Sequence, residues 1–248
     1  MSRLPFVLLP PSEGKAVGGG PRSRAGVFDN VLAEPRAALL SVLSADRAAV
    51  ERLTGLRGPL LERASDSLER IIAGDAPALA TWRRYNGVVW IHLDPTTLTP
   101  AQRRRILVPS ALYGVTAGHD LIADYRLTFH ASIAGFGPLS AFWREPVTNA
   151  LLDFVGRCPI VDLLPTEHRR AIDVERVVGQ TRVITVRFQS ADGTRAIGHA
   201  AKAVKGVLAR RLLVEGTAAL ESFAWGPWRG AMLDDFTAAI TSRAAGDA

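Results

Sequence analysis

Residues 106–127, ILVPSALYGVTAGHDLIADYRL, place a Tyr113-Gly114 corner between two apolar segments. The stretch predicts the end of a short helix, a hairpin at that corner, a helical turn at 120–122 and an extended exit through 125–127. Glycine permits backbone geometry and close approach that a side chain blocks. The pattern therefore indicates a helix-hairpin-helix-like element whose backbone N–H groups suit a phosphate. A packed helical corner without a ligand is the alternative.

The remaining elements alternate between helix and strand. The apolar run Leu4–Leu9, ended by Pro10-Pro11, predicts a buried strand, and Asp192-Gly193 predicts a hairpin turn into 195–197. Further strands are expected at 86–93, 159–164 and 182–189. Helices are expected at 36–43, 47–53, 60–72, 77–84, 100–107, 139–155, 166–170 and 199–212. These elements predict a mixed α/β (α+β) fold with a central mixed sheet and surrounding helices.

Length and composition indicate one compact domain. The 248 residues contain no internal repeat and no low-complexity linker, so residues 1–248 are expected to form a single domain that frays from about residue 235. No apolar run reaches the ~18 residues of a membrane span, and no signal-peptide pattern is present, which predicts a cytoplasmic protein. The single cysteine, Cys158, excludes an internal disulfide. We expect a monomer.

The charge balance favours an anionic partner. Thirty Lys and Arg face 24 Asp and Glu, which gives a net charge of +6 and a pI near 10.2. Such a balance suits phosphate contacts and counterion release. Few of the basic residues are lysines, and an arginine- and alanine-rich composition also arises from genomic base composition. Charge alone therefore raises the case for nucleic acid modestly.

Residues 199–212 form a helix with two distinct faces. A helical wheel separates the apolar arc from a face that carries His199, Lys202, Lys205, Gly206 and Ala209. A glycine inside a helix costs about 1 kcal/mol relative to alanine, so close approach of a ligand or a second backbone has to offset it. No acidic residue lies between Asp192 and Glu215 to pair with the lysines. The helix predicts an anion-binding face, or else a packed interface in which the lysines pair with Asp120, Asp124 or Glu167.

Six motifs in chain order resemble the YaaA peroxide-stress family. They are Pro10-Pro-Ser-Glu-Gly-Lys15; Tyr85-Asn-Gly-Val-Val-Trp90; Leu112-Tyr-Gly-Val115 with Asp120-Leu-Ile and Tyr125-Arg-Leu127; Phe142-Trp143 with Thr148-Asn149; Val161-Asp-Leu-Leu with Glu167; and Lys202-x-x-Lys-Gly206 with Arg210. The resemblance implies a mixed α/β single domain, a basic cleft, DNA binding and protection from peroxide damage. Two departures, Ser12-Glu-Gly-Lys15 and the residues after Glu167, bear on substrate or DNA preference and not on the fold.

Two functions follow as expectations. The first is sequence-nonspecific DNA binding that protects the cell against peroxide. Its anion-binding residues are Ser12, Lys15, Tyr113, Gly114, Tyr125, Arg126, Asn149, Lys202, Lys205 and Arg210. The alternative is an enzyme that acts on a phosphorylated, nucleotide-like or other anionic small molecule in the same Lys/Arg-lined cleft. Its candidate catalytic residues are Lys15, Asp120, Arg126, Glu167, Lys202 and Lys205. No nucleophile–base pair at diagnostic spacing decides between the two.

The sequence predicts neither a metal nor a cofactor. The five histidines, at positions 92, 119, 130, 168 and 199, are dispersed and form no pair at a metal-ligand spacing. The glycine-rich segment after Lys15 lacks the phosphate-loop order, because its lysine precedes the glycines.

Overall fold

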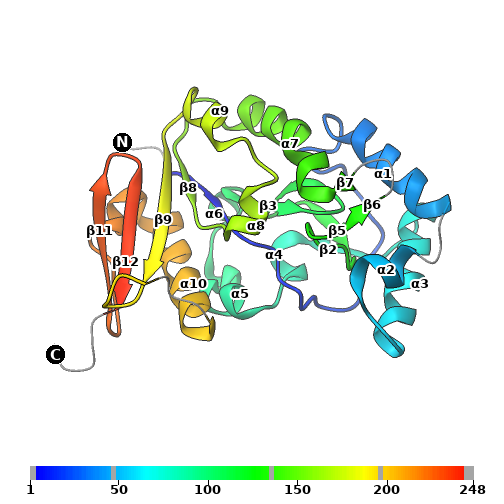
Figure 1. Ribbon diagram of the computed structural model, residues 1–248, viewed down its shortest axis with the longest axis horizontal. Coiled ribbons are helices and arrows are strands. Elements are labelled where there is room, and N and C mark those ends of the chain that lie inside the picture. The colour runs from blue at the N-terminus through cyan, green and yellow to red at the C-terminus, as the bar shows by residue number, and fades with distance from the viewer. Residues whose placement is uncertain (1–3, 46–48, 134–136, 195–197, 243–248) are drawn as a thin grey trace.

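The protein is built on a mixed eight-stranded sheet with helices on both sides (Figure 1). The computed structural model describes residues 4–45, 49–133, 137–194 and 198–242. The strand order is β10-β11-β12-β9-β8-β1-β3-β4. The strands of this sheet are β1 (Phe6–Leu8), β3 (Ile106–Ser110), β4 (Gly114–Ala117), β8 (Ile160–Asp162), β9 (Val183–Gln189), β10 (Ala224–Trp225), β11 (Trp228–Asp234) and β12 (Thr237–Ser242). This architecture confirms the predicted mixed α/β fold.

Helices and two small strand pairs complete the chain. The strand pairs are β2 (Ala78–Ala80) with β5 (Leu121–Ala123), and β6 (Ser132–Ile133) with β7 (Gly137–Pro138). The helices are α1 (Ala33–Ala45), α2 (Ala49–Thr54), α3 (Pro59–Ala73), α4 (Thr81–Arg84), α5 (Val88–Leu93), α6 (Pro100–Arg103), α7 (Leu139–Val155), α8 (Thr166–Arg169), α9 (Val174–Val178) and α10 (Gly198–Glu215), with 3-10 turns η1 (Pro95–Thr97) and η2 (Thr217–Leu220). None of the described helices is long and apolar enough to cross a bilayer.

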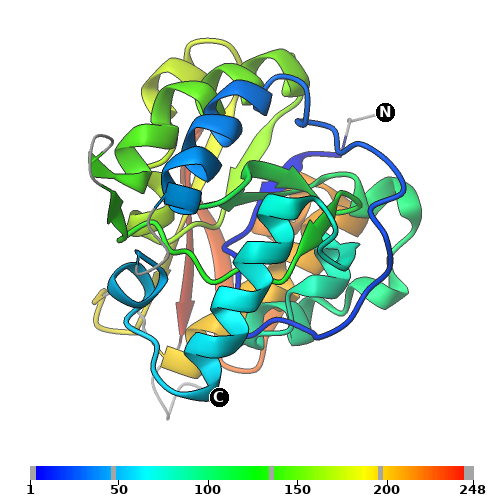
Figure 2. The same ribbon diagram turned by 90° about the vertical axis from the view of Figure 1, so that its right-hand side faces the viewer.

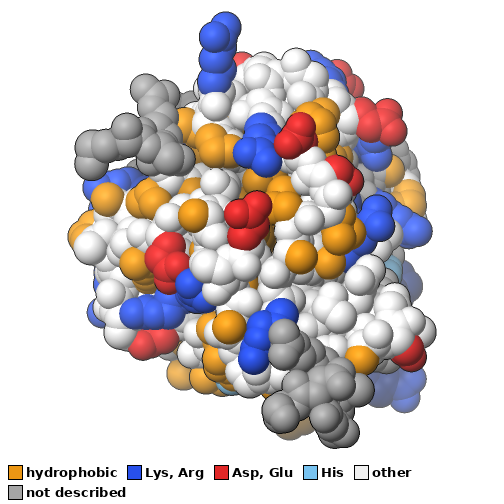
Figure 3. Space-filling model, turned by 90° about the vertical axis from the view of Figure 1, so that its left-hand side faces the viewer, with side chains coloured by type: hydrophobic (Ala, Val, Ile, Leu, Met, Phe, Trp, Pro, Cys, Tyr) orange, Lys and Arg blue, Asp and Glu red, His pale blue; other side chains and the backbone are white. Residues whose placement is uncertain are grey.

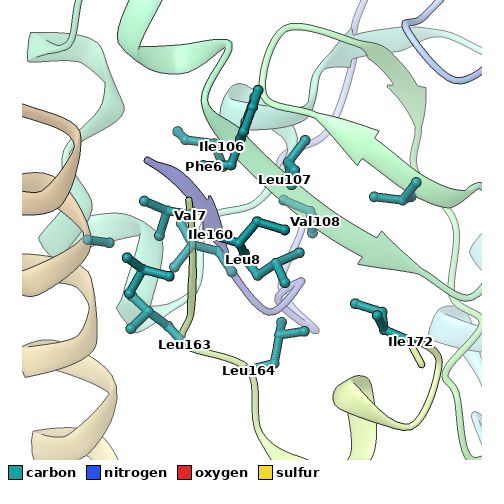
Figure 4. Packing of buried hydrophobic residues seen from close by; sticks show 14 of the residues in the cluster. Phe6, Val7, Leu8, Ile106, Leu107, Val108, Ile160, Leu163, Leu164 and Ile172 are labelled. Carbon is teal, nitrogen blue, oxygen red and sulfur yellow. The ribbon is translucent and has the colours of Figure 1, made fainter. Parts of the chain in front are cut away.

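The five strands β12, β9, β8, β1 and β3 run parallel, so their carboxyl ends meet at one edge. Strand β1 is buried between β8 and β3, and its Val7 packs with Ile106 and Ile160 in the core (Figure 4). Helices α7 and α9 lie on one side of the sheet and α5 and α10 on the other (Figure 1). Helices α1, α2 and α3 gather at the end of the molecule that faces the viewer in Figure 2.

The predicted helix-hairpin-helix-like element is wrong, because residues 106–117 form a β-hairpin. Strands β3 and β4 pair antiparallel around the Tyr113-Gly114 corner, and 121–123 is strand β5. Residues 106–110 are all buried and pair with β1 on their other side, which is the environment of a central strand. Gly114 has a φ of 77°, and a Cβ there would lie 2.8 Å from Trp143. The glycine therefore serves a buried turn and exposes no amides to a ligand.

The strand predicted at 86–93 is also wrong, because Val88–Leu93 forms helix α5. Helix α10 packs closely against it: a Cβ on Gly206 would lie 2.3 Å from the carbonyl oxygen of Val89. This tertiary contact overrides the β propensity of the valines. Gly206 and Ala209 are therefore buried, and of the two explanations that the sequence left open for the glycine, close approach of a second backbone is confirmed.

At the C-terminus, residues 237–242 do not fray, since they form β12 between β9 and β11. Strands β11 and β12 pair antiparallel in this part of the chain. The hairpin predicted at 195–197 lies outside the described residues.

Candidate functional site

All three lysines of the chain lie at the carboxyl edge of the parallel strands. Lys15 sits in the loop that follows β1, and Lys202 and Lys205 lie in the first half of α10, which follows β9. Lys205 Nζ lies 5.0 Å from the ring centre of Phe188, near the carboxyl end of β9. Beyond β1 the chain crosses to β3 on one side, while β8 lies on the other. In parallel sheets such a switch point opens the crevice where ligands bind.

The N-terminal half of α10 lies towards the loop that carries Lys15. Gly206 packs on Val89 and Leu93 of α5, and Arg210 donates to the carbonyl of Asp94, beyond the end of α5. The two helices therefore run in the same direction, which places Lys202 level with the start of α5. There Gly87 is packed against Ser12, because a Cβ on this glycine would lie 2.7 Å from Ser12 Cβ.

The Lys15 cluster comprises Lys15, Tyr85, Asp124, Tyr125 and Arg126. Lys15 Nζ donates to the carbonyl of Ser12 at 3.1 Å and lies 4.5 Å from the ring centre of Tyr125 and 5.6 Å from that of Tyr85. The two tyrosine hydroxyls share a hydrogen bond of 2.8 Å. Arg126 donates to the carbonyl of Glu13 at 2.7 Å and to Asp124 at 3.2 Å. Two segments far apart in sequence thus meet around one amine.

The electrostatics of this cluster favour a neutral Lys15. Burial, together with the positive charge of Arg126, lowers the pKa of Lys15 to about 7. Within the described part of the chain no ion pair joins Lys15 to a carboxylate, since Asp124 pairs with Arg63 and Arg126. Burial raises the pKa of Tyr125 to about 12, so its hydroxyl keeps its proton. A substantial fraction of the lysine is therefore an uncharged amine near neutral pH.

This shift predicts a pH-dependent contribution to stability. The pKa of Lys15 is about 7 in the folded chain, and its ordinary value of 10.5 applies to the unfolded chain. Between pH 7 and 10.5 the unfolded chain therefore binds more protons than the folded chain. Stability from this group therefore rises with pH from about 7 to 10.5 and is flat below about 7. We expect the melting temperature of the wild type to rise above pH 7 relative to that of Lys15→Met when the two are compared from pH 6 to 9.5. Lys202→Met is the matched control. A difference that stays constant above pH 7 contradicts a lowered lysine pKa.

A second group, the His168 cluster, lies after β8 and against α10. It contains His130, Glu167, His168 and Lys205. His130 Nε2 lies 2.9 Å from Glu167 Oε2, and the His168 ring packs edge-on against Phe129. Burial, and then the charge of Lys205, lower the pKa of His168 to about 4, which keeps the imidazole neutral. Its Nδ1 is buried without a hydrogen-bond partner.

Several predicted site residues lie elsewhere or have structural roles. Tyr113 and Gly114 are buried in the hairpin, Asn149 is exposed on α7, and Arg210 donates to Thr97 next to η1. Asp120 accepts hydrogen bonds from the backbone N–H groups of Val27 and Ala117, so it braces two loops. The structure brings together Ser12, Lys15, Tyr125 and Arg126 in one group, and Glu167 and Lys205 in another.

Sequence reasoning missed three residues that shape the site. Arg84 is fully buried, and its guanidinium donates to the carbonyls of Ala16 and Gly18, which follow Lys15 directly. Asp124 pairs with Arg126 and with Arg63, and Tyr85 forms half of the aromatic wall around Lys15. Arg83 and Arg84 are adjacent basic residues, and no local pattern separates the buried Arg84 from the exposed Arg83.

Two other features carry no comparable chemistry. A shallow depression of about 530 Å³ near the amino end of β9 is lined by Val178–Arg182, Asp235 and Phe236. Its arginine, Arg182, already donates to the carbonyl of Asp235. Among the described residues no group of three or more His, Cys, Asp or Glu side chains is arranged to hold a metal ion. The carboxyl edge therefore remains the candidate site.

Comparison with known proteins agrees with the motifs. The family model described as "Peroxide stress protein YaaA" matches residues 6–229. A UPF0246 protein of Streptomyces coelicolor is 33% identical over 223 residues, which cover 86% of this chain and 84% of that protein. A UPF0246 protein of Corynebacterium efficiens is 30% identical over 216 residues, which cover 84% of each chain. The matched region includes both lysine-bearing segments.

Proposed function

This chain belongs to the family of the peroxide stress protein YaaA, and from that membership we propose that it acts in the response to peroxide stress by binding an anionic small molecule at the carboxyl edge of its sheet. The ligand lies between the Lys15 cluster and the lysines of α10. Lys202 and Lys205 supply positive charge, and Arg126 supplies hydrogen-bond donors on the opposite side.

One observation carries this proposal: the chain has three lysines among 30 basic residues, and all three lie at one edge of the sheet. The remaining basic residues are arginines spread along the whole sequence. Anionic groups are stabilised where several cations converge and where a helix N-terminus adds positive potential. Helix α10 begins at Gly198 and carries both lysines in its first half.

DNA is the second candidate ligand, favoured by the net charge of +6. The hairpin that sequence reasoning assigned to phosphate contact is buried. On the face shown in Figure 3, basic side chains are interspersed with acidic and hydrophobic ones and form no continuous stripe. Lys15 and Arg126 are half-buried, which suits a small ligand better than a duplex. Phosphates of a duplex need exposed cations along a continuous track.

Ligand titration tests the proposal. We expect a small anion from a panel of inorganic phosphate, nucleotides and 2-oxo acids to raise the melting temperature, and the double variant Lys202→Ala/Lys205→Ala to weaken its binding by about tenfold, or ~1.4 kcal/mol. Arg182→Ala, at the opposite edge of β9, is the matched control and should bind normally.

A parallel titration with a labelled duplex at about 50 and 200 mM salt separates the two candidates. Salt-sensitive duplex binding that the lysine variant abolishes, with no response to any small anion, overturns the small-molecule proposal and leaves DNA. If neither kind of ligand depends on the two lysines, the carboxyl edge is not the binding site.

A further inference from the structure

Lys15 is a lysine in a chain whose basic residues are mostly arginines. Twenty-seven of the 30 basic residues are arginines, so a cation required only for its charge is usually arginine in this chain. The two side chains differ in chemistry, because lysine alone can lose its proton and act as a nucleophile at physiological pH. Lys202 is exposed on α10, whereas Lys15 is half-buried between two aromatic rings.

The surroundings of Lys15 hold the amine in a defined place. Its Nζ is tethered to the carbonyl of Ser12, and the tyrosine rings on its flank replace water. The tyrosines are themselves locked by their mutual hydrogen bond and by the T-shaped packing of Tyr113 on Tyr125, with ring centres 5.6 Å apart. A desolvated amine beside a second cation is the arrangement that activates lysine towards carbonyl compounds.

Arg126 identifies the class of partner. It is the charged group with the largest electrostatic effect on Lys15. Its guanidinium has five N–H donors. One of them donates to the carbonyl of Glu13 and another donates to the carboxylate of Asp124. Donors remain for a carboxylate, which arginine binds in a planar, two-pronged geometry. A carboxylate held there brings an adjacent carbonyl group towards the lysine.

We propose that Lys15 is a nucleophile that forms an imine with a small 2-oxo acid whose carboxylate is held by Arg126. The inference rests on the proposed binding of an anionic small molecule at this edge, and it names that molecule's class. The neutral amine adds to the carbonyl carbon and gives a carbinolamine. The carbinolamine then loses its hydroxyl group as water. Both hydrogens of this water come from the amine nitrogen, and one proton from solvent then binds the imine nitrogen, which leaves a protonated imine. No oxidant or reductant is consumed.

Reductive trapping on the full chain tests this step. The protein is incubated at about pH 7.5 with pyruvate or glyoxylate and sodium cyanoborohydride, and the adduct is located by peptide mass spectrometry. Only three lysines and the N-terminus supply amines, so the assignment is direct. We expect Lys15 to be modified at least ten times faster than Lys202, and Lys15→Arg to lose that adduct.

Arg126→Gln separates a directed reaction from simple amine reactivity. We expect this variant to slow trapping of the 2-oxo acid about ten times more than it slows trapping of an uncharged aldehyde such as propanal, because loss of the Arg126 charge lets the pKa of Lys15 rise and slows both reactions. Equal modification of Lys15 and Lys202, or a 2-oxo acid reaction indifferent to Arg126→Gln, overturns the inference.

Binding measured on Lys15→Arg keeps the two proposals distinguishable. If 2-oxo acids or other anions stabilise the wild type and this variant alike, and no adduct forms, the imine is excluded while anion binding stands. If no anion binds either protein, and no adduct forms, the proposed function fails together with the inference that rests on it.

Discussion

Replacing Arg84 with methionine is expected to lower the free energy of unfolding by about 3–5 kcal/mol, because several carbonyl oxygens lose a buried, charged hydrogen-bond donor. The guanidinium is fully buried and donates to the carbonyls of Ala16, Gly18, Pro77 and Ile122. Methionine fills part of the volume and leaves these acceptors without donors, each at a cost of roughly 1–3 kcal/mol. Urea denaturation measures the loss as a lower midpoint at an unchanged slope.

The neighbouring arginine is the matched control. Arg83 is exposed, and its guanidinium lies 4.9 Å from the ring centre of Trp82. Arg83→Met should change stability by less than about 0.5 kcal/mol. Equal losses in the two variants contradict the view that Arg84 clamps the loop after β1.

The same substitution should also affect Lys15. Two of the carbonyls that Arg84 binds belong to Ala16 and Gly18, so the clamp holds the loop that carries the lysine. Without it, water reaches the amine and its pKa returns towards the usual value. In the Arg84→Met background, the melting temperature of the protein with Lys15 should therefore no longer rise above pH 7 relative to that of its Lys15→Met variant.

Gly206→Ala is expected to destabilise the protein by about 1–3 kcal/mol, the usual cost of overpacking. In an exposed helix this substitution is stabilising by about 1 kcal/mol, because alanine is the better helix former. Here the new Cβ would lie 2.3 Å from the carbonyl oxygen of Val89 and 2.9 Å from the backbone nitrogen of Leu93. Helices α5 and α10 must move apart to admit the new Cβ, because the Val89 oxygen and the Leu93 nitrogen belong to the backbone of α5. Thermal unfolding monitored by circular dichroism measures the effect.

Gly179→Ala provides the contrast. Gly179 has helical backbone angles at the end of α9, and a Cβ there would meet Arg176 O at 3.4 Å, an ordinary contact. This variant should be neutral to within about 0.5 kcal/mol. A stabilising effect of Gly206→Ala would mean that the two helices do not pack as closely as described.

The elements that the sequence predicted correctly are those whose local pattern and tertiary role agree. The apolar run before Pro10-Pro11 is the buried strand β1, and the helix predicted at 139–155 is α7 with the same bounds. Strand β9 and helix α10 were found in the same way, since nothing in the fold opposes their local propensities. Predictions about these elements needed no knowledge of their neighbours.

The wrong predictions share a physical cause. Residues 106–110 lie between two strands, so a run that also fits a helix end becomes β3. Val88–Leu93 lies against a helix whose glycine permits contact, so valines become helical as α5. The helical wheel put Gly206 opposite the apolar arc, and only the contact with α5 decided between a ligand and a second backbone as its neighbour. In each case a partner distant in sequence decided the outcome.

By itself the sequence determined the family and the mixed α/β class, because motif order and composition are local properties. It also singled out Ser12, Lys15, Tyr125 and Arg126, which the structure brings into one cluster. Only the tertiary structure decided that Tyr113 and Gly114 are buried, that Arg84 is a clamp and that Asp124 pairs with Arg126. Burial and ion pairing depend on contacts between segments up to about a hundred residues apart, and the desolvation that lowers the pKa of Lys15 exists only once those segments have met.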